Sequence, residues 1–210
     1  DELKYAVGPH PPADHLGGMD DVILDLDVDQ VLLPRATTTT QTYADVLDAI
    51  EAKNVPVTVP VKGQTFQLGD ATVSVVAAQQ ADDLNNVSIV LRTTYEDTSF
   101  LFMGDAETEV ETAILSAGTN IKSNVLKVGH HGSSTSTSSA FLAAVSPDAA
   151  VISCGAGNSY GHPSAATLQK LIDIPVWRTD LNGTIIAMTD GQACRQEAEG
   201  LEGHLKGGDE

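Results

Sequence analysis

Three short, mostly apolar runs of this chain each lead into a histidine or an aspartate. Asp105 follows the run 100–103, His130 and His131 follow the run 124–128, and His162 follows the run 149–153. If these runs are parallel strands, their carboxyl ends meet at one edge of a sheet, where open α/β folds place their sites. The chain is therefore constrained to layered packing with polar side chains gathered along one edge.

Short β-rich runs alternate with helical stretches along the chain, which predicts an α/β or α+β domain. Strand candidates are rich in Val, Ile, Leu, Phe and Thr; they are 29–33, 71–77, 87–93, 99–103, 124–128, 149–153, 176–178 and 183–188. Helix candidates are 42–53, 107–117, 138–145 and 165–172. Asn182-Gly183 lies between the last two strand candidates, a pattern typical of a tight hairpin turn.

The length of 210 residues and a hydrophobic content of 41% suffice for a core that needs no disulfide support. We interpret residues 1–190 as one domain and the polar, Gly- and Glu-rich stretch 191–210 as a mobile or partly ordered tail. The two cysteines, Cys154 and Cys194, form no CxxC motif. No apolar run is long enough to predict a membrane span.

Eleven basic and 29 acidic residues leave a net charge of −18. Such a polyanion is a poor nonspecific binder of nucleic acid, although metal ions at one site can still hold a nucleic-acid substrate. Aromatic residues make up only 4% of the chain, which disfavours base-stacking surfaces. The acidic, lysine-poor composition suits an extracytoplasmic hydrolase, while the oligomeric state is left open.

Five of the six histidines lie close to Gly, Asp or Pro, and the sixth, His204, is interpreted as a solvated tail residue. The first group is His10, Asp14 and His15 in a proline-rich segment. Imidazole and carboxylate in such a segment can converge on a divalent zinc, manganese or iron ion. A polar turn before a helix, capped by Asp14, explains this segment equally well.

The other groups have ordinary explanations when taken singly: a turn after a strand, a Ser-rich loop with helix capping, and a turn with an exposed histidine. Adjacent residues on a strand point to opposite sides, so we expect only one of His130 and His131 to bind a metal directly. Delivery of all these groups to one edge favours a single metal site over four unrelated turns. No serine is singled out as a nucleophile, and the chain has no phosphate-binding P-loop.

Six motifs stand in a recognisable order: PHPPADHLGG at 9–18, NNVSIVL at 85–91, FLFMGDAE at 100–107, LKVGHHGSSTS at 126–136, NSYGHP at 158–163 and WRTDLNGTI at 177–185. With them, the chain resembles the metallo-β-lactamase superfamily. More narrowly, it is similar to the hydrolase domain of ComEC-type competence proteins and their free-standing bacterial relatives. The resemblance covers about residues 4–188 and implies a four-layer αββα sandwich with a metal centre at one edge.

The family's metal motif is H-x-H-x-D-H, and Pro12 stands here in the place of its second histidine. Proline has no side-chain donor to offer. The resemblance therefore implies one tightly bound ion and one weak or absent ion, zinc or manganese. The metal ligands that it implies are His10, Asp14, His15, Asp105 as the bridging carboxylate, His130 or His131, and His162.

The family opens with strands that carry D-V-G-Q-G-D and I-D-G-G-like turns, and these motifs are absent from this sequence. We expect either that the sequence is truncated at its front relative to that pattern or that the first hairpin is genuinely lost. We therefore expect the first sheet to have fewer strands and an exposed edge.

The leading hypothesis is a metal-dependent hydrolase in which metal-bound hydroxide attacks a phosphodiester or a carbonyl carbon. The resemblance favours a phosphodiester, with DNA as one candidate. The alternative is a degenerate, non-catalytic domain that serves as a binding or accessory module, because Pro12 replaces a ligand. The residues assigned to catalysis are Asp14, Asp105 and His162, and those assigned to substrate binding are Lys127, Ser133 and Asn86.

Overall fold

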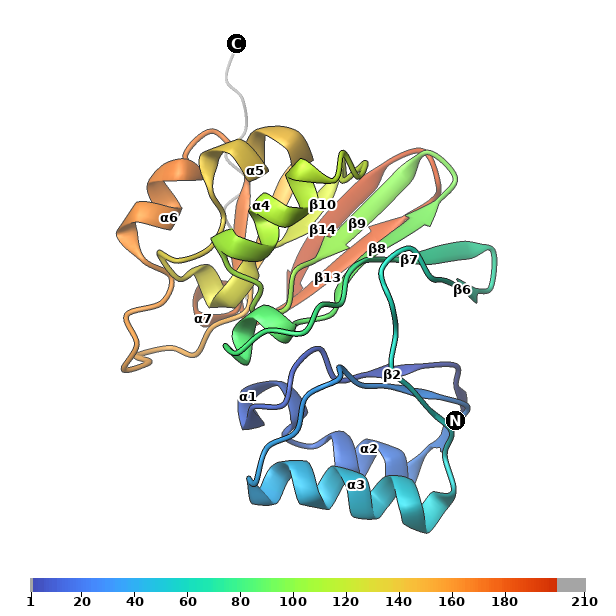
Figure 1. Ribbon diagram of the computed structural model, residues 1–210. Coiled ribbons are helices and arrows are strands. Elements are labelled where there is room, and N and C mark those ends of the chain that lie inside the picture. Colours follow the sequence, from blue (N-terminus) through green and yellow to red (C-terminus); the bar gives the residue numbers. More distant parts are fainter. Residues whose placement is uncertain (1, 200–210) are drawn as a thin grey trace.

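A seven-stranded mixed sheet forms the centre of the computed structural model, which describes residues 2–199 (Figure 1). β9 to β12 run parallel, whereas β6 to β9 alternate in direction. The carboxyl ends of β9, β10 and β11 therefore meet at one edge. In order across the sheet the strands are β12 (Val176–Arg178), β11 (Ala149–Ile152), β10 (Val125–Lys127), β9 (Thr98–Phe102), β8 (Val90–Tyr95), β7 (Ala71–Ala77) and β6 (Thr65–Leu68).

Helices α4 (Thr108–Ser116), α5 (Ser139–Val145) and α6 (Ala165–Lys170) cover the outer face of this sheet (Figure 1). The side chains of Ser138 and Ser164 begin α5 and α6 by accepting a backbone N–H from the first turn. Val110, Ile114 and Phe141 of these helices share one apolar core with the sheet residues Leu101, Leu126 and Ile152.

A second, smaller β layer faces the large sheet and has its own helical cover. α3 is capped by Thr40, whose hydroxyl accepts the Tyr43 N–H, and Val46 and Ile50 of α3 pack beneath the small strands. The strands are β2 (Ala6–Val7), β4 (Val31–Leu32) and β5 (Val57–Thr58) in one parallel sheet, and β1 (Glu2–Leu3) with β3 (Asp27–Val28) in another. The helices are α1 (Ala13–Leu16), α2 (Met19–Asp25) and α3 (Gln41–Lys53).

The order of layers is therefore α2 and α3, the small strands, the large sheet, and α4 to α6 (Figure 1). Leu32, Phe66, Val73 and Ile89 join the two β layers in one apolar cluster. This arrangement confirms the predicted αββα sandwich. β2 and β5 are the two edge strands of the three-stranded sheet.

The hairpin predicted at Asn182-Gly183 is wrong. Residues Thr179–Asn182 form helix α7, which ends at Gly183 with φ 68°, and the Asn182 side chain accepts the Arg178 N–H. β12 belongs to the large sheet, whereas β13 (Thr184–Thr189) pairs with β14 (Cys194–Glu199). An Asn-Gly pair can end a short helix as well as it can turn a hairpin, because glycine tolerates positive φ in both.

The boundary predicted at residue 191 falls inside an ordered hairpin. Cys194–Glu199 forms β14, and the Asp190 carboxylate accepts two N–H groups of the turn that precedes it. The Thr98 and Thr189 hydroxyls, 2.7 Å apart, tie this hairpin to the large sheet. Residues 194–199 of the predicted tail therefore form a strand, while 200–210 lie outside the described residues. Within 2–199, no helix combines the length and the apolarity needed to cross a bilayer.

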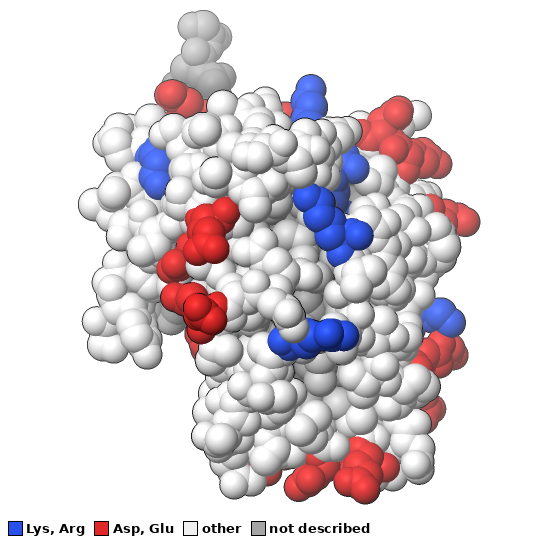
Figure 2. Space-filling view, in the orientation of Figure 1, with Lys and Arg blue, Asp and Glu red and all other residues white. Residues whose placement is uncertain are grey.

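We predict that salt stabilises this fold. The net charge is −18, and acidic side chains are spread over both halves of the face in Figure 2, while Lys and Arg are few. Raising NaCl from about 0.1 M to about 1 M shortens the Debye length from about 10 Å to about 3 Å and weakens this repulsion. Thermal unfolding should show a Tm that rises by several degrees.

A double variant, Asp25→Lys with Asp48→Lys, provides the matched comparison because both side chains are exposed on the outer helices. It changes the net charge from −18 to −14 and should show a smaller rise in Tm with salt. A Tm that does not depend on salt in the parent chain would contradict the prediction.

Candidate metal centre

The buried carboxylate of Asp105 is the centre of the site. It follows β9 through Gly104, which has φ 55° and lies so close to Ser88 that a Cβ there would be 3.0 Å from the Ser88 hydroxyl. The Asp105 N–H donates to that hydroxyl at 3.0 Å, and the residue is 2% exposed. The turn therefore aims a fully desolvated charge at the edge of the sheet, where it needs partners.

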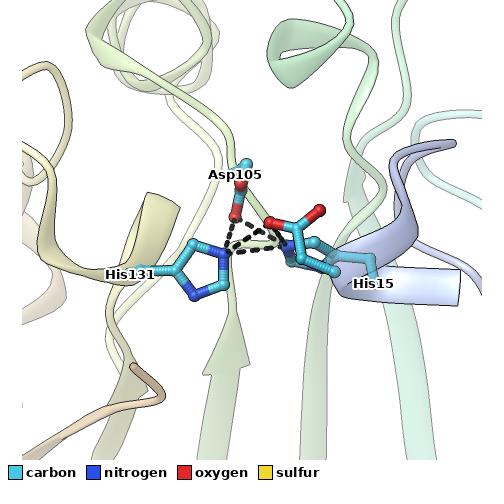
Figure 3. A group of neighbouring side chains, drawn as sticks. His15, Asp105 and His131 are labelled. Atoms are coloured by element: carbon cyan, nitrogen blue, oxygen red, sulfur yellow. Dashed lines mark hydrogen bonds and ion pairs between the residues drawn. The ribbon is translucent and has the colours of Figure 1, made fainter. Parts of the chain in front are cut away.

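Two imidazoles and a second carboxylate approach one oxygen of Asp105. Figure 3 shows His15, from α1, and His131, from the turn after β10, converging on Asp105 from opposite sides. His15 Nε2 lies 3.0 Å and His131 Nε2 3.5 Å from Asp105 Oδ1, and the two nitrogens are 3.1 Å apart. Asp14 Oδ2 completes the group at 3.3 Å from His131 Nε2 and 3.9 Å from His15 Nε2.

These four atoms fit a divalent ion. All of them lie within 4.8 Å of one another, and the five separations given above range from 3.0 to 3.9 Å. Ligands at about 2.0–2.1 Å from a tetrahedral zinc ion are about 3.3–3.4 Å apart. Asp105 Oδ1 is moreover buried and has no hydrogen-bond partner among the described residues. Two nitrogens and two oxygens are a donor set that both zinc and manganese accept.

The tautomer of His131 supports this assignment. Its Nδ1 lies 2.8 Å from the carbonyl oxygen of Ser153, which can only accept, so Nδ1 carries the proton. In the neutral ring the lone pair of Nε2 then faces Asp105 and His15, where it meets other electron-rich atoms. A cation or an added proton at Nε2 is therefore required for a stable arrangement.

Charge in the group follows the same logic. Burial by itself raises the pKa of the Asp105 carboxyl, but the imidazoles of His10, His131 and His15 outweigh it and hold that pKa far below its usual range. The Asp105 carboxylate in turn raises the pKa of His131, although partial burial of the ring opposes this. The site thus keeps Asp105 ionised and concentrates negative charge where a metal would bind.

The second oxygen of Asp105 faces two other histidines. His10 Nε2 lies 3.4 Å and His130 Nε2 3.8 Å from Asp105 Oδ2. His10 is 1% exposed, and its Nδ1 has no hydrogen-bond partner among residues 2–199. Nδ1 of His130 lies 3.1 Å from a Glu107 carboxylate oxygen, which fixes the ring. Asp105 therefore lies between two groups of possible metal donors.

The two adjacent histidines were expected to project from a strand, and the structure corrects this. They lie in a turn, Gly129–Gly132, with φ 48° at His130 and 53° at His131. Both Nε2 atoms approach Asp105, but from different sides, and His131 alone of the pair belongs to the four-donor group. This positive-φ turn is what allows neighbouring residues to reach one carboxylate.

A buried network holds this turn and the loop after it. The Glu111 carboxylate, 1% exposed, accepts the backbone N–H groups of Thr137 and Ser138. Thr135 donates to the Glu107 carboxylate at 2.6 Å. Sequence reasoning missed Ser88, Glu107, Glu111 and Ser153. A signal was present for Ser88, in the NNVSIVL motif, and for Glu107, in the FLFMGDAE motif.

His162 and Lys127 lie beside the centre but outside the four-donor group. The His162 ring centroid is 5.5 Å from that of His130, its Nδ1 is buried without a partner among the described residues, and burial lowers its pKa. Lys127 ends β10, its ammonium donates to the Val128 carbonyl, and burial lowers its pKa. Pro12 occupies the N-cap position of α1 without a side-chain capping bond.

Asn86 and Ser133 have structural contacts in place of the predicted substrate contacts. Asn86 is 4% exposed, and its side-chain amide oxygen Oδ1 accepts the backbone N–H of Glu107 at 3.1 Å. Ser133 is 5% exposed, and its hydroxyl lies 2.9 Å from that of Thr135. Both residues are buried away from solvent and position the loop that carries Glu107 and His130.

Comparison with known proteins identifies the family of this chain. A profile of the metallo-beta-lactamase superfamily matches residues 10–156, and the chain therefore belongs to that superfamily. The match begins at His10 and includes the four donors of the centre.

More narrowly, the chain is similar to competence proteins. It is 34% identical over 188 residues to ComE operon protein 3 of Bacillus subtilis (strain 168), a match that covers 88% of this chain and 24% of that protein. It is 42% identical over 106 residues to competence protein ComA of Neisseria gonorrhoeae, covering 49% of this chain and 15% of that protein. The chain thus spans about a quarter or less of the length of these relatives.

Solved structures show the same fold. CmlA, a diiron β-hydroxylase from Streptomyces venezuelae, matches with a TM-score of 0.52 at 13% identity, covering 80% of this chain and 38% of that one. A mutant CmlA β-hydroxylase matches with a TM-score of 0.54 at 12% identity, covering 84% and 43%. At such low identity the likeness is one of fold alone.

We predict that Asp105→Asn abolishes tight metal binding, because it removes the charge shared by both donor groups. The loss in affinity for zinc should exceed the ~10–100-fold typical of losing an outer hydrogen-bond partner. Calorimetric titration of the apoprotein measures it, with Asp48→Asn, exposed on α3, as the matched control. Equal zinc affinity in Asp105→Asn and the parent chain would contradict the assignment.

Metal affinity should also depend on pH. His15 and His131 bind a metal only as neutral rings, and the pKa of His131 is raised by Asp105. Protons therefore compete with the metal as the pH falls through this raised pKa, and affinity is lost from the neutral range downward. Zinc titrations between about pH 8 and pH 5 measure this effect. If the affinity does not change over that range, these imidazoles are not ligands.

Proposed function

We propose that this chain is a metal-dependent hydrolase that acts on a phosphodiester. The observation that carries the proposal is the four-donor group of Asp14, His15, Asp105 and His131, with spacings suited to one divalent ion. Membership of the metallo-beta-lactamase superfamily, whose fold positions this group at the sheet edge, supports it.

A divalent ion in this group would act as a Lewis acid, lowering the pKa of a water molecule to roughly 7 and polarising the ester. The protein's own residues prepare the site for it. Asp105 supplies a desolvated negative charge to both donor groups, and the Ser153 carbonyl keeps the Nε2 lone pair of His131 directed inward. Glu107 orients His130 in the same way on the other side.

The number of ions follows from the number of donors. The group at Asp105 Oδ1 has four donors, whereas that at Oδ2 has His10 and His130 besides the shared carboxylate. Pro12 adds none. We therefore propose one tightly held ion, zinc or manganese, and a second, weaker position.

Two further residues would act on the substrate. Lys127 is the basic side chain nearest the centre along β10, and its ammonium can neutralise a phosphate oxygen. His162 carries a buried Nδ1 that has no partner among the described residues and lies beside His130, so this atom could hold the proton that a leaving oxygen must receive.

The choice of phosphodiester rests on the resemblance to the hydrolase domain of ComEC-type proteins, and the similarity to ComE operon protein 3 and competence protein ComA supports it. DNA is one candidate within that substrate class. The net charge of −18 disfavours a long duplex, so short or single-stranded DNA, or a small phosphodiester, is preferred. The non-catalytic alternative keeps one observation in its favour, the loss of a donor at Pro12.

Hydrolysis of bis(p-nitrophenyl) phosphate tests the proposal. Tag-free protein should be inactive after exhaustive chelation and active when zinc or manganese is restored. Asp105→Asn and Asp14→Asn should stay inactive with added metal, and Asp48→Asn should match the parent chain. Hydrolysis that survives chelation would contradict metal dependence, and metal binding without turnover on any phosphodiester would favour the accessory-module alternative.

A further inference from the structure

A cavity of about 560 Å³ lies between the two β layers and opens onto the metal centre. Its walls are apolar on both sides, because strands of each layer turn branched and aromatic side chains toward it. The small layer contributes Tyr5, Val7 and Leu32, and the large sheet contributes Phe66, Leu68, Val73, Ile89, Leu91 and Phe102.

One end of this cavity is polar and the rest is not. Asp14, His15 and His131 of the four-donor group line that end, together with Lys127 and Ser153. Lys127 is the only lysine or arginine among the lining residues. Away from this end, Tyr5 and Thr93 are the only lining side chains with a hydrogen-bonding atom.

The walls leave large apolar side chains in contact with solvent. Phe102 is 44% exposed and Leu68 is 48% exposed, although both lie on strands of the central sheet. Exposed apolar surface that continues into a cavity beside a reactive site is typical of a ligand pocket, and the volume falls in the range of about 300–1,000 Å³ usual for such pockets.

We propose that the cavity binds the unbranched apolar chain of an amphiphilic phosphodiester, whose phosphate lies at the metal centre beside Lys127. This inference rests on the proposed function for the position of the phosphate. The charges are complementary, since the phosphate meets the one lining ammonium and the metal, while the chain meets walls that offer almost no hydrogen bonds. A nucleobase fits less well, because its polar edges would find few partners there.

Binding tests the inference without any need for turnover. Methyl, butyl and octyl phosphate, kept below the concentrations at which they aggregate, serve as probes of the zinc-loaded protein in calorimetry. Affinity should rise with chain length by up to about fourfold per buried methylene until the cavity is full. Heat capacity changes should become more negative along the series.

Two variants locate the effect. Phe102→Asp places a charge on an exposed part of the wall, and Thr93→Trp fills the space. Each should lower the ratio of octyl to methyl phosphate affinity, and the second keeps the test informative if the first misfolds. Ile172→Asp is the matched control, because Ile172 is 67% exposed and does not line the cavity.

The outcomes separate the two proposals. If octyl phosphate binds no more tightly than methyl phosphate, or if the gain survives in both wall variants, the inference is overturned whatever the hydrolytic activity. If the gain is present and falls in the wall variants, but no alkyl p-nitrophenyl phosphate is hydrolysed, the cavity assignment stands and the proposed hydrolase function fails.

Discussion

The desolvated carboxylate of Asp105 is the interaction on which the rest of the site depends. A charge at 2% exposure is stable only where cations or donors surround it, and four imidazoles from two segments of the chain fill that role. Its two oxygens face two donor groups. The carboxylate therefore joins α1 of the small layer to the turn after β10 of the large sheet.

Backbone shape makes this convergence possible. Gly104 turns β9 into Asp105, and positive φ at both His130 and His131 brings adjacent residues to opposite sides of the same carboxylate. Such conformations are costly without support. Glu107, Glu111 and Ser153 supply it through hydrogen bonds to the His130 ring, to the loop backbone and to the His131 ring.

Much of the fold could be predicted from the sequence, because apolar runs such as 71–77 and 176–178 match β7 and β12. The candidate metal ligands could be predicted for the same reason, because Asp105, His130 and His131 come soon after such runs. The features that the sequence did not predict depend on contacts between distant segments of the chain. β14 is polar and is defined by pairing with β13, the Asn182-Gly183 pair ends a helix, and burial turned Asn86 and Ser133 into structural residues.

X-ray absorption spectroscopy of the protein loaded with one equivalent of zinc tests the central claim most directly. The geometry predicts four light ligands at about 2.0–2.1 Å, two of them imidazoles, as expected for His15, His131 and the carboxylates of Asp14 and Asp105. A zinc ion with no imidazole ligand, with a sulfur ligand, or surrounded by six oxygens would contradict this account.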